Sequence, residues 1–182
     1  MKSSGLIYSI VILLLLTGLF SGRSTIKNMS KSESQVNQAY FNIEKKYFNQ
    51  HIFLNDLLDE INEECTSIND SLIKDLLPDI HEPKGISDYD FDQFRAAREK
   101  QVNIDLLVNN LGQFLSANCQ GLSSGIFVKV ERLETEQKDI LRDWEDYNSK
   151  VRMHNTYIKK FPRNFYSSFF KFRSKPYYKV EK

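Results

Sequence analysis

Glycine and proline are scarce in this sequence. Its 182 residues include seven glycines and four prolines, where average usage would give about thirteen and nine. Neither residue occurs within the intervals 23–77, 86–111 and 126–161. A many-stranded sandwich or barrel needs a turn about every eight to twelve residues. These long intervals therefore exclude such folds and favour long helices.

The sequence also lacks the motifs of several functional classes. No glycine-rich phosphate loop is present, which argues against a P-loop or dinucleotide-binding domain. Cys65 and Cys119 form no CxxC pair, so they either form a bridge or remain buried thiols. The three histidines, His51, His81 and His154, form no HExxH or di-iron pairing. We therefore expect no catalytic, cofactor-binding or metal-binding residues.

One acidic run is similar to part of a calcium loop. Asp88, Asp90, Asp92 and Glu99 match four of its acidic positions. However, Gln93 stands where the sharp turn requires glycine. We interpret the run as the acidic start of a helix, where negative charge is favourable.

The net charge of +1 gives no global attraction for nucleic acid, but charge is unevenly distributed. Residues 55–100 hold thirteen acidic and five basic residues, whereas residues 159–182 hold eight basic residues and one glutamate. The basic segment also contains many phenylalanines and tyrosines. These either fold back to cap a bundle end or meet a membrane interface. Stacking on single-stranded nucleic acid is the least favoured interpretation.

An uncharged, apolar stretch runs from Ser3 to Gly22. As a helix it would cover about 30 Å, the thickness of a bilayer's hydrocarbon core. A cleaved signal peptide is the alternative, but the large Leu19 and Phe20 stand where cleavage sites prefer small residues. We expect an uncleaved single-pass anchor in the cell membrane. The basic residues on either side slightly favour a cytoplasmic body over an extracytoplasmic one.

Apolar residues recur at alternating spacings of three and four in three segments, which predicts amphipathic helices. The first segment runs from Val36 towards Pro78, the second from Phe94 to Leu115, and the third from Ile126 to Ile158. Each has a glutamine within its apolar face: Gln50, Gln101 and Gln137. These glutamines either form a buried polar layer that fixes helix register or lie exposed at the bundle ends. His154 lies within the third face and is expected to be a buried core residue.

We therefore predict an all-α fold, an up-and-down antiparallel bundle of three long helices with room for a short fourth. The predicted organisation is a transmembrane anchor at 1–22, a juxtamembrane connector at 23–34, the bundle at 35–162 and a basic aromatic tail at 163–182. The connector, rich in serine and lysine, is expected to be frayed.

The third segment carries a more specific pattern, which resembles the carboxy-terminal half of LemA family proteins. The residues that carry it are Tyr147, Asn148, Val151, Asn155, Phe161 and Pro162. Weaker similarity is found around Val36 to Tyr40 and at Arg95 to Arg98. The resemblance implies a bacterial-type protein with one amino-terminal membrane helix and an all-helical bundle. It implies architecture and location rather than a reaction.

The sequence departs from the family pattern in a consistent direction. The arginines, acid and proline of the family's first helix are absent from residues 49–57, and Gln137 and Trp144 stand where a glutamate and an arginine are expected. We hypothesise that inter-helix ion pairing is replaced here by packing around Ile52, Phe53 and Trp144, since losing both charges together can be near neutral.

Asn148 and Asn155 lie seven residues apart on one helical face. They are the best candidates for a shared role, and we expect inter-helix hydrogen bonding rather than ligand binding. The favoured function is a membrane-anchored scaffold or protein-interaction module that contacts lipid through its anchor, binds a protein partner and does not bind nucleic acid. The alternatives are a hydrolase-like enzyme with dispersed active-site residues and a signal-cleaved envelope protein.

Overall fold

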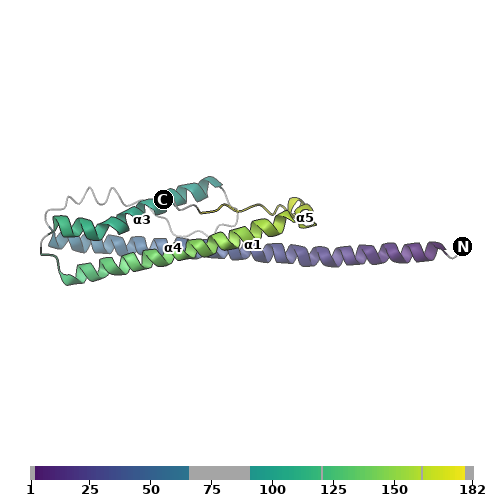
Figure 1. Cartoon of the computed structure of the whole chain (residues 1–182), viewed down its shortest axis with the longest axis horizontal. Helices are drawn as coiled ribbons and strands as arrows, with labels where there is room; N and C mark the ends of the chain where they lie inside the picture. Colours follow the sequence, from purple (N-terminus) through teal and green to yellow (C-terminus); the bar gives the residue numbers. More distant parts are fainter. Residues whose placement is uncertain (1–2, 66–90, 120, 161, 179–182) are drawn as a thin grey trace. The chain divides into compact units, whose positions relative to one another are not determined.

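In a computed structural model of the chain, every regular element among the described residues is a helix (Figure 1). The structure describes residues 3–65, 91–119, 121–160 and 162–178, without the side chains of residues 3–21, 91–93 and 96–97. The helices are α1 (Ser3–Glu64), α3 (Phe91–Asn118), α4 (Ser124–Lys159) and α5 (Arg163–Phe169). The predicted all-α fold is confirmed.

The chain divides into two compact units. The central unit comprises Asn37–Tyr147, and the terminal unit combines Met1–Val36 with Asn148–Lys182. Helices α1 and α4 contribute residues to both units. Each unit has its own buried residues.

The apolar faces predicted from the spacing form the buried core. The described members of the three faces are at most 5% exposed. In the central unit they are Tyr40, Ile43, Tyr47, Leu54, Leu57, Ile61, Phe94, Ile104, Val108, Leu111, Leu115, Ile126, Val130, Leu133, Ile140, Trp144 and Tyr147. The one-sided pattern works because each helix can bury its apolar face against the other two.

The prediction that neighbouring helices all run antiparallel is wrong for one pair, α1 and α3. Contacts pair Lys46 with Asp143 and Glu60 with Lys129, so α4 runs antiparallel to α1. By contrast, Tyr40 contacts Phe94 and Cys65 is bonded to Cys119, so α1 and α3 run parallel. Short connections place consecutive helices antiparallel, but α1 ends at Glu64, long before α3 begins at Phe91.

A disulfide closes one end of the central unit. Cys65 follows α1 and Cys119 follows α3, and their Cα atoms are 5.6 Å apart. The bond connects positions 54 residues apart in the chain. Of the two alternatives that the sequence left open, a bridge or buried free thiols, the structure shows the bridge.

In the terminal unit, α1 continues without a break through residues 23–34, where we predicted a frayed connector. Gly22, Met29 and Val36 are buried there and lie at seven-residue intervals. This periodicity extends the buried face of α1 towards the amino end. The segment is therefore helical because it has a face to pack, despite its serines and lysines.

Two left-handed backbone positions mark turns after helices. Gly121 follows α3 with φ 89°, a conformation that glycine adopts without steric cost. Lys171 follows α5 with φ 58°, and the Phe172 amide donates to the Ser167 carbonyl at 2.9 Å. This bond closes the last turn of α5 and directs residues 172–178 away as an extended segment.

Several predictions fall outside the described residues. They include the helix end near Pro78, His81, and the acidic helix start at Asp88 and Asp90. Among the residues whose side chains the structure describes, no helix has a stretch long and apolar enough to span a bilayer.

Candidate functional site

The two signature asparagines of α4 bind the backbone of the extended tail. Asn148 donates from Nδ2 to the Tyr178 carbonyl at 2.8 Å and accepts from the Tyr178 amide at 2.8 Å. Asn155 makes the same pair of bonds with Lys175, at 2.9 and 2.8 Å. Each side-chain amide thus satisfies both backbone polar groups of one tail residue. We call this arrangement the asparagine clamp.

The spacing of the clamp matches the geometry of its two partners. Seven helical residues from Asn148 to Asn155 rise about 10.5 Å, and three extended residues from Lys175 to Tyr178 cover about 10 Å. The tail therefore runs antiparallel to α4 with its amides in register. The two asparagines make equivalent contacts, but the predicted inter-helix hydrogen bonding is wrong, because their partner is the backbone of an extended segment.

Two further residues, His154 and Lys175, connect the tail to the rest of the terminal unit. His154 is fully buried, with Nε2 3.2 Å from the Arg173 carbonyl and Nδ1 3.3 Å from Ser32 Oγ. The carbonyl can only accept, so the bond assigns the proton to Nε2 and leaves Nδ1 to accept from the serine. Lys175 Nζ lies 2.6 Å from Glu33 Oε1. The prediction of a hydrogen-bonded core histidine is confirmed.

The electrostatic environment keeps His154 neutral. Burial lowers the pKa of its imidazole, and the neighbouring Lys175 lowers it further. The Arg173 carbonyl and the Glu33 carboxylate act in the opposite direction but are weaker than burial. A neutral ring suits a structural role between Ser32 and the tail backbone.

Of the other signature residues, two have packing roles. Tyr147 and Val151 are completely buried on the inner face of α4. Pro162 is exposed and immediately precedes α5, where a missing amide proton costs nothing. Phe161 lies outside the described residues.

A second polar arrangement lies in the core of the central unit. Gln50 Nε2 donates to Gln137 Oε1 at 2.9 Å, Gln137 donates to Asp105, and the Tyr47 hydroxyl donates to Asp105 at 2.9 Å. Gln50 and Gln137 thus form the buried polar layer that was one of the two predicted alternatives. Gln101 is also buried, but its Oε1 atom makes no hydrogen bond among the described residues.

Asp105 is the residue of this network that the sequence did not reveal. It follows Ile104 in α3 and lies one position away from the apolar face. Burial raises the pKa of its carboxyl group, while the bonds from Tyr47 and Gln137 oppose that shift. An acidic residue directly after the predicted core position Ile104 was the only available signal. Networks of this kind fix helix register because any sliding breaks several bonds.

An aromatic cluster packs beside this network. Tyr40, Phe94, Trp144 and Tyr147 have ring centroids 5.3–6.4 Å apart. Trp144 is 1% exposed, and its indole N–H points to the Tyr47 hydroxyl at 3.4 Å. Trp144 therefore packs against α1, as our hypothesis requires.

Two other residues in that hypothesis behave differently from Trp144. Ile52 is 45% exposed and is not part of the buried core. Phe53 is half-buried, with the Arg132 guanidinium carbon 4.8 Å from its ring centroid. The packing that we expected in place of the ion pairs therefore includes Trp144. The prediction that Ile52 takes part in it was wrong.

Glu44 lies next to the aromatic cluster. Burial raises the pKa of its carboxyl group to about 7, and the neighbouring Tyr40 hydroxyl acts in the opposite direction. The same burial, together with Glu44, raises the pKa of Tyr40. Glu44 therefore exchanges a proton near neutral pH while Tyr40 stays protonated.

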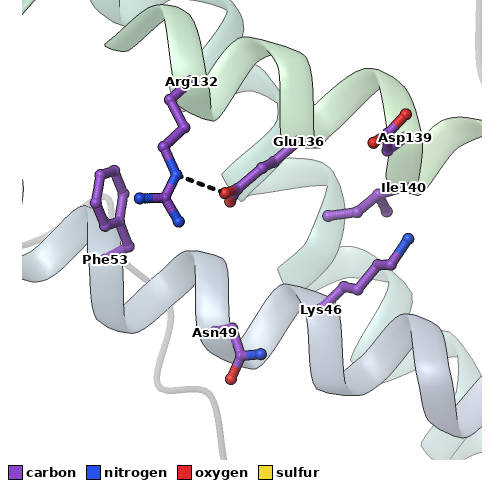
Figure 2. Close-up of a pocket in the computed structure, with 7 residues that line it drawn as sticks. All are labelled: Lys46, Asn49, Phe53, Arg132, Glu136, Asp139 and Ile140. Atoms are coloured by element: carbon purple, nitrogen blue, oxygen red, sulfur yellow. Dashed lines mark hydrogen bonds and ion pairs between the residues drawn. The ribbon is translucent and has the colours of Figure 1, made fainter. Parts of the chain in front are cut away.

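A shallow groove of about 320 Å³ lies between α1 and α4 in the central unit (Figure 2). Lys46, Asn49 and Phe53 come from α1, and Arg132, Glu136, Asp139 and Ile140 come from α4. Figure 2 shows Arg132 beside the Phe53 ring, with its Nε 2.9 Å from Glu136. Charges of both signs line the groove and are largely paired, so it selects no ligand charge. Neither Glu44 nor Asp105 lines it.

The described residues contain no group of three His, Cys, Asp or Glu side chains that could hold a metal ion. Asp88 and Asp90 of the calcium-like run lie outside the described residues, and Glu99 is exposed. Both cysteines are committed to the disulfide.

The helical core and the asparagine clamp define the class: an all-α bundle protein whose extended tail is held along one of its own helices. The family model described as LemA family matches residues 125–182. This match includes α4, α5 and the clamped tail, and it confirms the resemblance carried by the signature residues. No curated protein and no solved structure matches the chain.

Proposed function

We propose that this protein is a membrane-anchored helical-bundle scaffold of LemA type, a protein-interaction module rather than an enzyme. The observation that supports this is the asparagine clamp. Asn148 and Asn155 are signature residues within the family-matched region, and their amide groups are occupied by the tail backbone. These side chains therefore fix the position of the tail, and a protein-interaction module needs such a fixed surface.

The membrane anchor is proposed from the uncharged stretch between Ser3 and Gly22. Its length suits one crossing of a bilayer. Amino-terminal sequencing of the protein recovered from cell membranes tests this assignment. A mature chain that begins near residue 22 would show instead a signal-cleaved envelope protein.

Two features point to opposite orientations of the body. The one-charge difference across the stretch slightly favours the cytoplasm. The Cys65–Cys119 disulfide favours an oxidising compartment, because cytosolic thiols are kept reduced. The charge difference is small, so we give the disulfide more weight and propose an extracytoplasmic body. Thiol alkylation of intact cells, followed by reduction and a second mass tag, tests this: tagging only after reduction supports it.

The scaffold role is tested by recovering partners from detergent-solubilised membranes. We expect a partner to copurify with the full chain and to be lost when the tail after Phe161 is removed or when Asn148 and Asn155 are both changed to alanine. Asn109→Ala, at an exposed position of α3, is the control and should retain the partner. Failure of the full chain to recover any partner would count against the scaffold.

The alternative is a hydrolase-like enzyme with dispersed residues. A pocket lined by carboxylates of raised pKa would favour it. Glu44 and Asp105 have such pKa values, but the groove between α1 and α4 is lined by other residues. The scaffold is therefore better supported. We propose a protein partner and lipid as its ligands, and no nucleic acid.

A further inference from the structure

Large apolar side chains of the terminal unit face solvent on and beside α5. Phe165 is 69% exposed, Phe169 is 74% exposed and Phe170 is 47% exposed. Phe165 and Phe169 lie four residues apart and therefore share one face of the helix. The ring centroids of Phe169 and Phe170 are 5.1 Å apart. Adjacent exposed aromatic rings mark an interaction surface.

A tyrosine fixes α5 against α1 at one particular level. A Cβ atom added at Gly22 would lie 3.1–3.4 Å from the Tyr166 hydroxyl and ring. The absence of a side chain at position 22 therefore lets the ring lie close to the α1 backbone. Gly22 is the last residue of the uncharged stretch, and Arg23 follows it. Helix α5 is thus held where the proposed anchor ends.

The surroundings of α5 are basic. Residues 147–180 contain no aspartate or glutamate. Lys159, Lys160, Lys171 and Arg173 are exposed, as are Arg23 and Lys27 on α1. Lys175 is different, since it is buried and paired with Glu33.

We propose that α5 docks on the surface of an anionic lipid bilayer. Phe165, Phe169 and Phe170 enter the interface, where aromatic rings are favoured, and Lys171 and Arg173 contact anionic headgroups. A bilayer fits better than a protein partner, because the aromatic face and the basic residues lie at the end of the uncharged stretch. This inference rests on the proposed membrane anchor and adds a second contact with the same membrane.

The test uses the full chain reconstituted in phosphatidylcholine vesicles with and without phosphatidylglycerol, containing acyl chains labelled with bromine, which quenches nearby tryptophan. F169W places a reporter on the exposed face of α5, and the wild type supplies the background from Trp144. V128W is the matched control, since Val128 is a comparably exposed apolar residue of the central unit. A third variant adds K171E and R173E to F169W.

We expect the tryptophan introduced by F169W to lose most of its emission in anionic vesicles and much less in phosphatidylcholine alone. Quenching should fall when K171E and R173E are added, whereas the V128W signal should change little. Equal quenching of F169W and V128W, or quenching of F169W that is independent of lipid charge, would overturn the proposal.

Flotation of the same vesicles at high salt tests the anchor separately. Protein that fails to float with the vesicles contradicts the anchor itself. Protein that floats but shows no quenching of the F169W reporter contradicts only the docking of α5.

Discussion

Asn155 shows how much one side chain contributes to this structure. Its amide satisfies the N–H and the C=O of Lys175, a residue that is only 5% exposed. Alanine at this position would leave both backbone groups buried without their partner. A buried polar group that loses its hydrogen bond costs far more than the net gain from forming the bond.

We therefore predict that Asn155→Ala destabilises the protein by about 1–3 kcal/mol. The urea midpoint should fall, and the Lys175 amide should exchange with solvent deuterium much faster than in the wild type. Asn109→Ala, an exposed position, should change neither quantity. Unchanged exchange at Lys175 in Asn155→Ala would show that the clamp does not hold the tail in solution.

Glu44 gives a prediction about pH. Its pKa is about 7 in the folded protein and ordinarily 4.5, so the folded state holds the proton more tightly than the unfolded state. Its contribution to stability is therefore complete below pH 4.5 and is lost as the pH rises through 7. His154, with its lowered pKa, acts in the opposite sense, so the comparison must be made between variants.

We expect Glu44→Gln to remove this loss. Between pH 5 and pH 8 the urea midpoint of the variant should fall less than that of the wild type. Glu63→Gln, at an exposed position of the same helix, should follow the wild type. Parallel curves for all three proteins would mean that Glu44 does not titrate near neutrality.

At the scale of elements, the disulfide constrains α1 and α3 most strongly. The closed loop contains about 54 residues, for which chain entropy predicts a stabilisation of about 4 kcal/mol. We predict that reduction lowers the urea midpoint of the wild type markedly. The double variant Cys65→Ser/Cys119→Ser should unfold at the lower midpoint and should not respond to reductant.

The helices could be predicted from the sequence because burial imposes a period that residues such as Val36, Ile104 and Val130 display directly. The parallel course of α1 and α3 could not, because periodicity identifies a helix's face but not its direction. The tail could not be predicted either. An extended segment held by side-chain amides has no hydrophobic period in the sequence. The only sign of it was the spacing of Asn148 and Asn155, seven residues apart on one helical face.

Asp105 illustrates another limit of sequence reasoning. A charged residue next to a core position usually points to solvent. Here Tyr47 and Gln137, from two other helices, supply its hydrogen bonds. Such a network depends on three helices meeting, which no local pattern encodes.

At the scale of the whole molecule, the two units can be followed by separate measurements: tryptophan fluorescence reports on the central unit, and deuterium exchange of the tail reports on the terminal unit. Trp144 is the only tryptophan, and its aromatic neighbours all belong to the central unit. We predict that Asn155→Ala leaves the wavelength of the tryptophan emission maximum unchanged without denaturant, while deuterium exchange in the tail increases. A red shift of that emission would show that the central unit depends on the clamp.

The composition of the terminal unit also affects when it can fold during synthesis. It combines residues 1–36 with residues from 148 onward, so its two parts leave the ribosome separately. At about 5–20 residues per second, roughly 6–22 s pass between them. During that interval the face of Met29 and Val36 lacks the carboxy-terminal part of its own unit. The first segment to be made is therefore among the last to be completed.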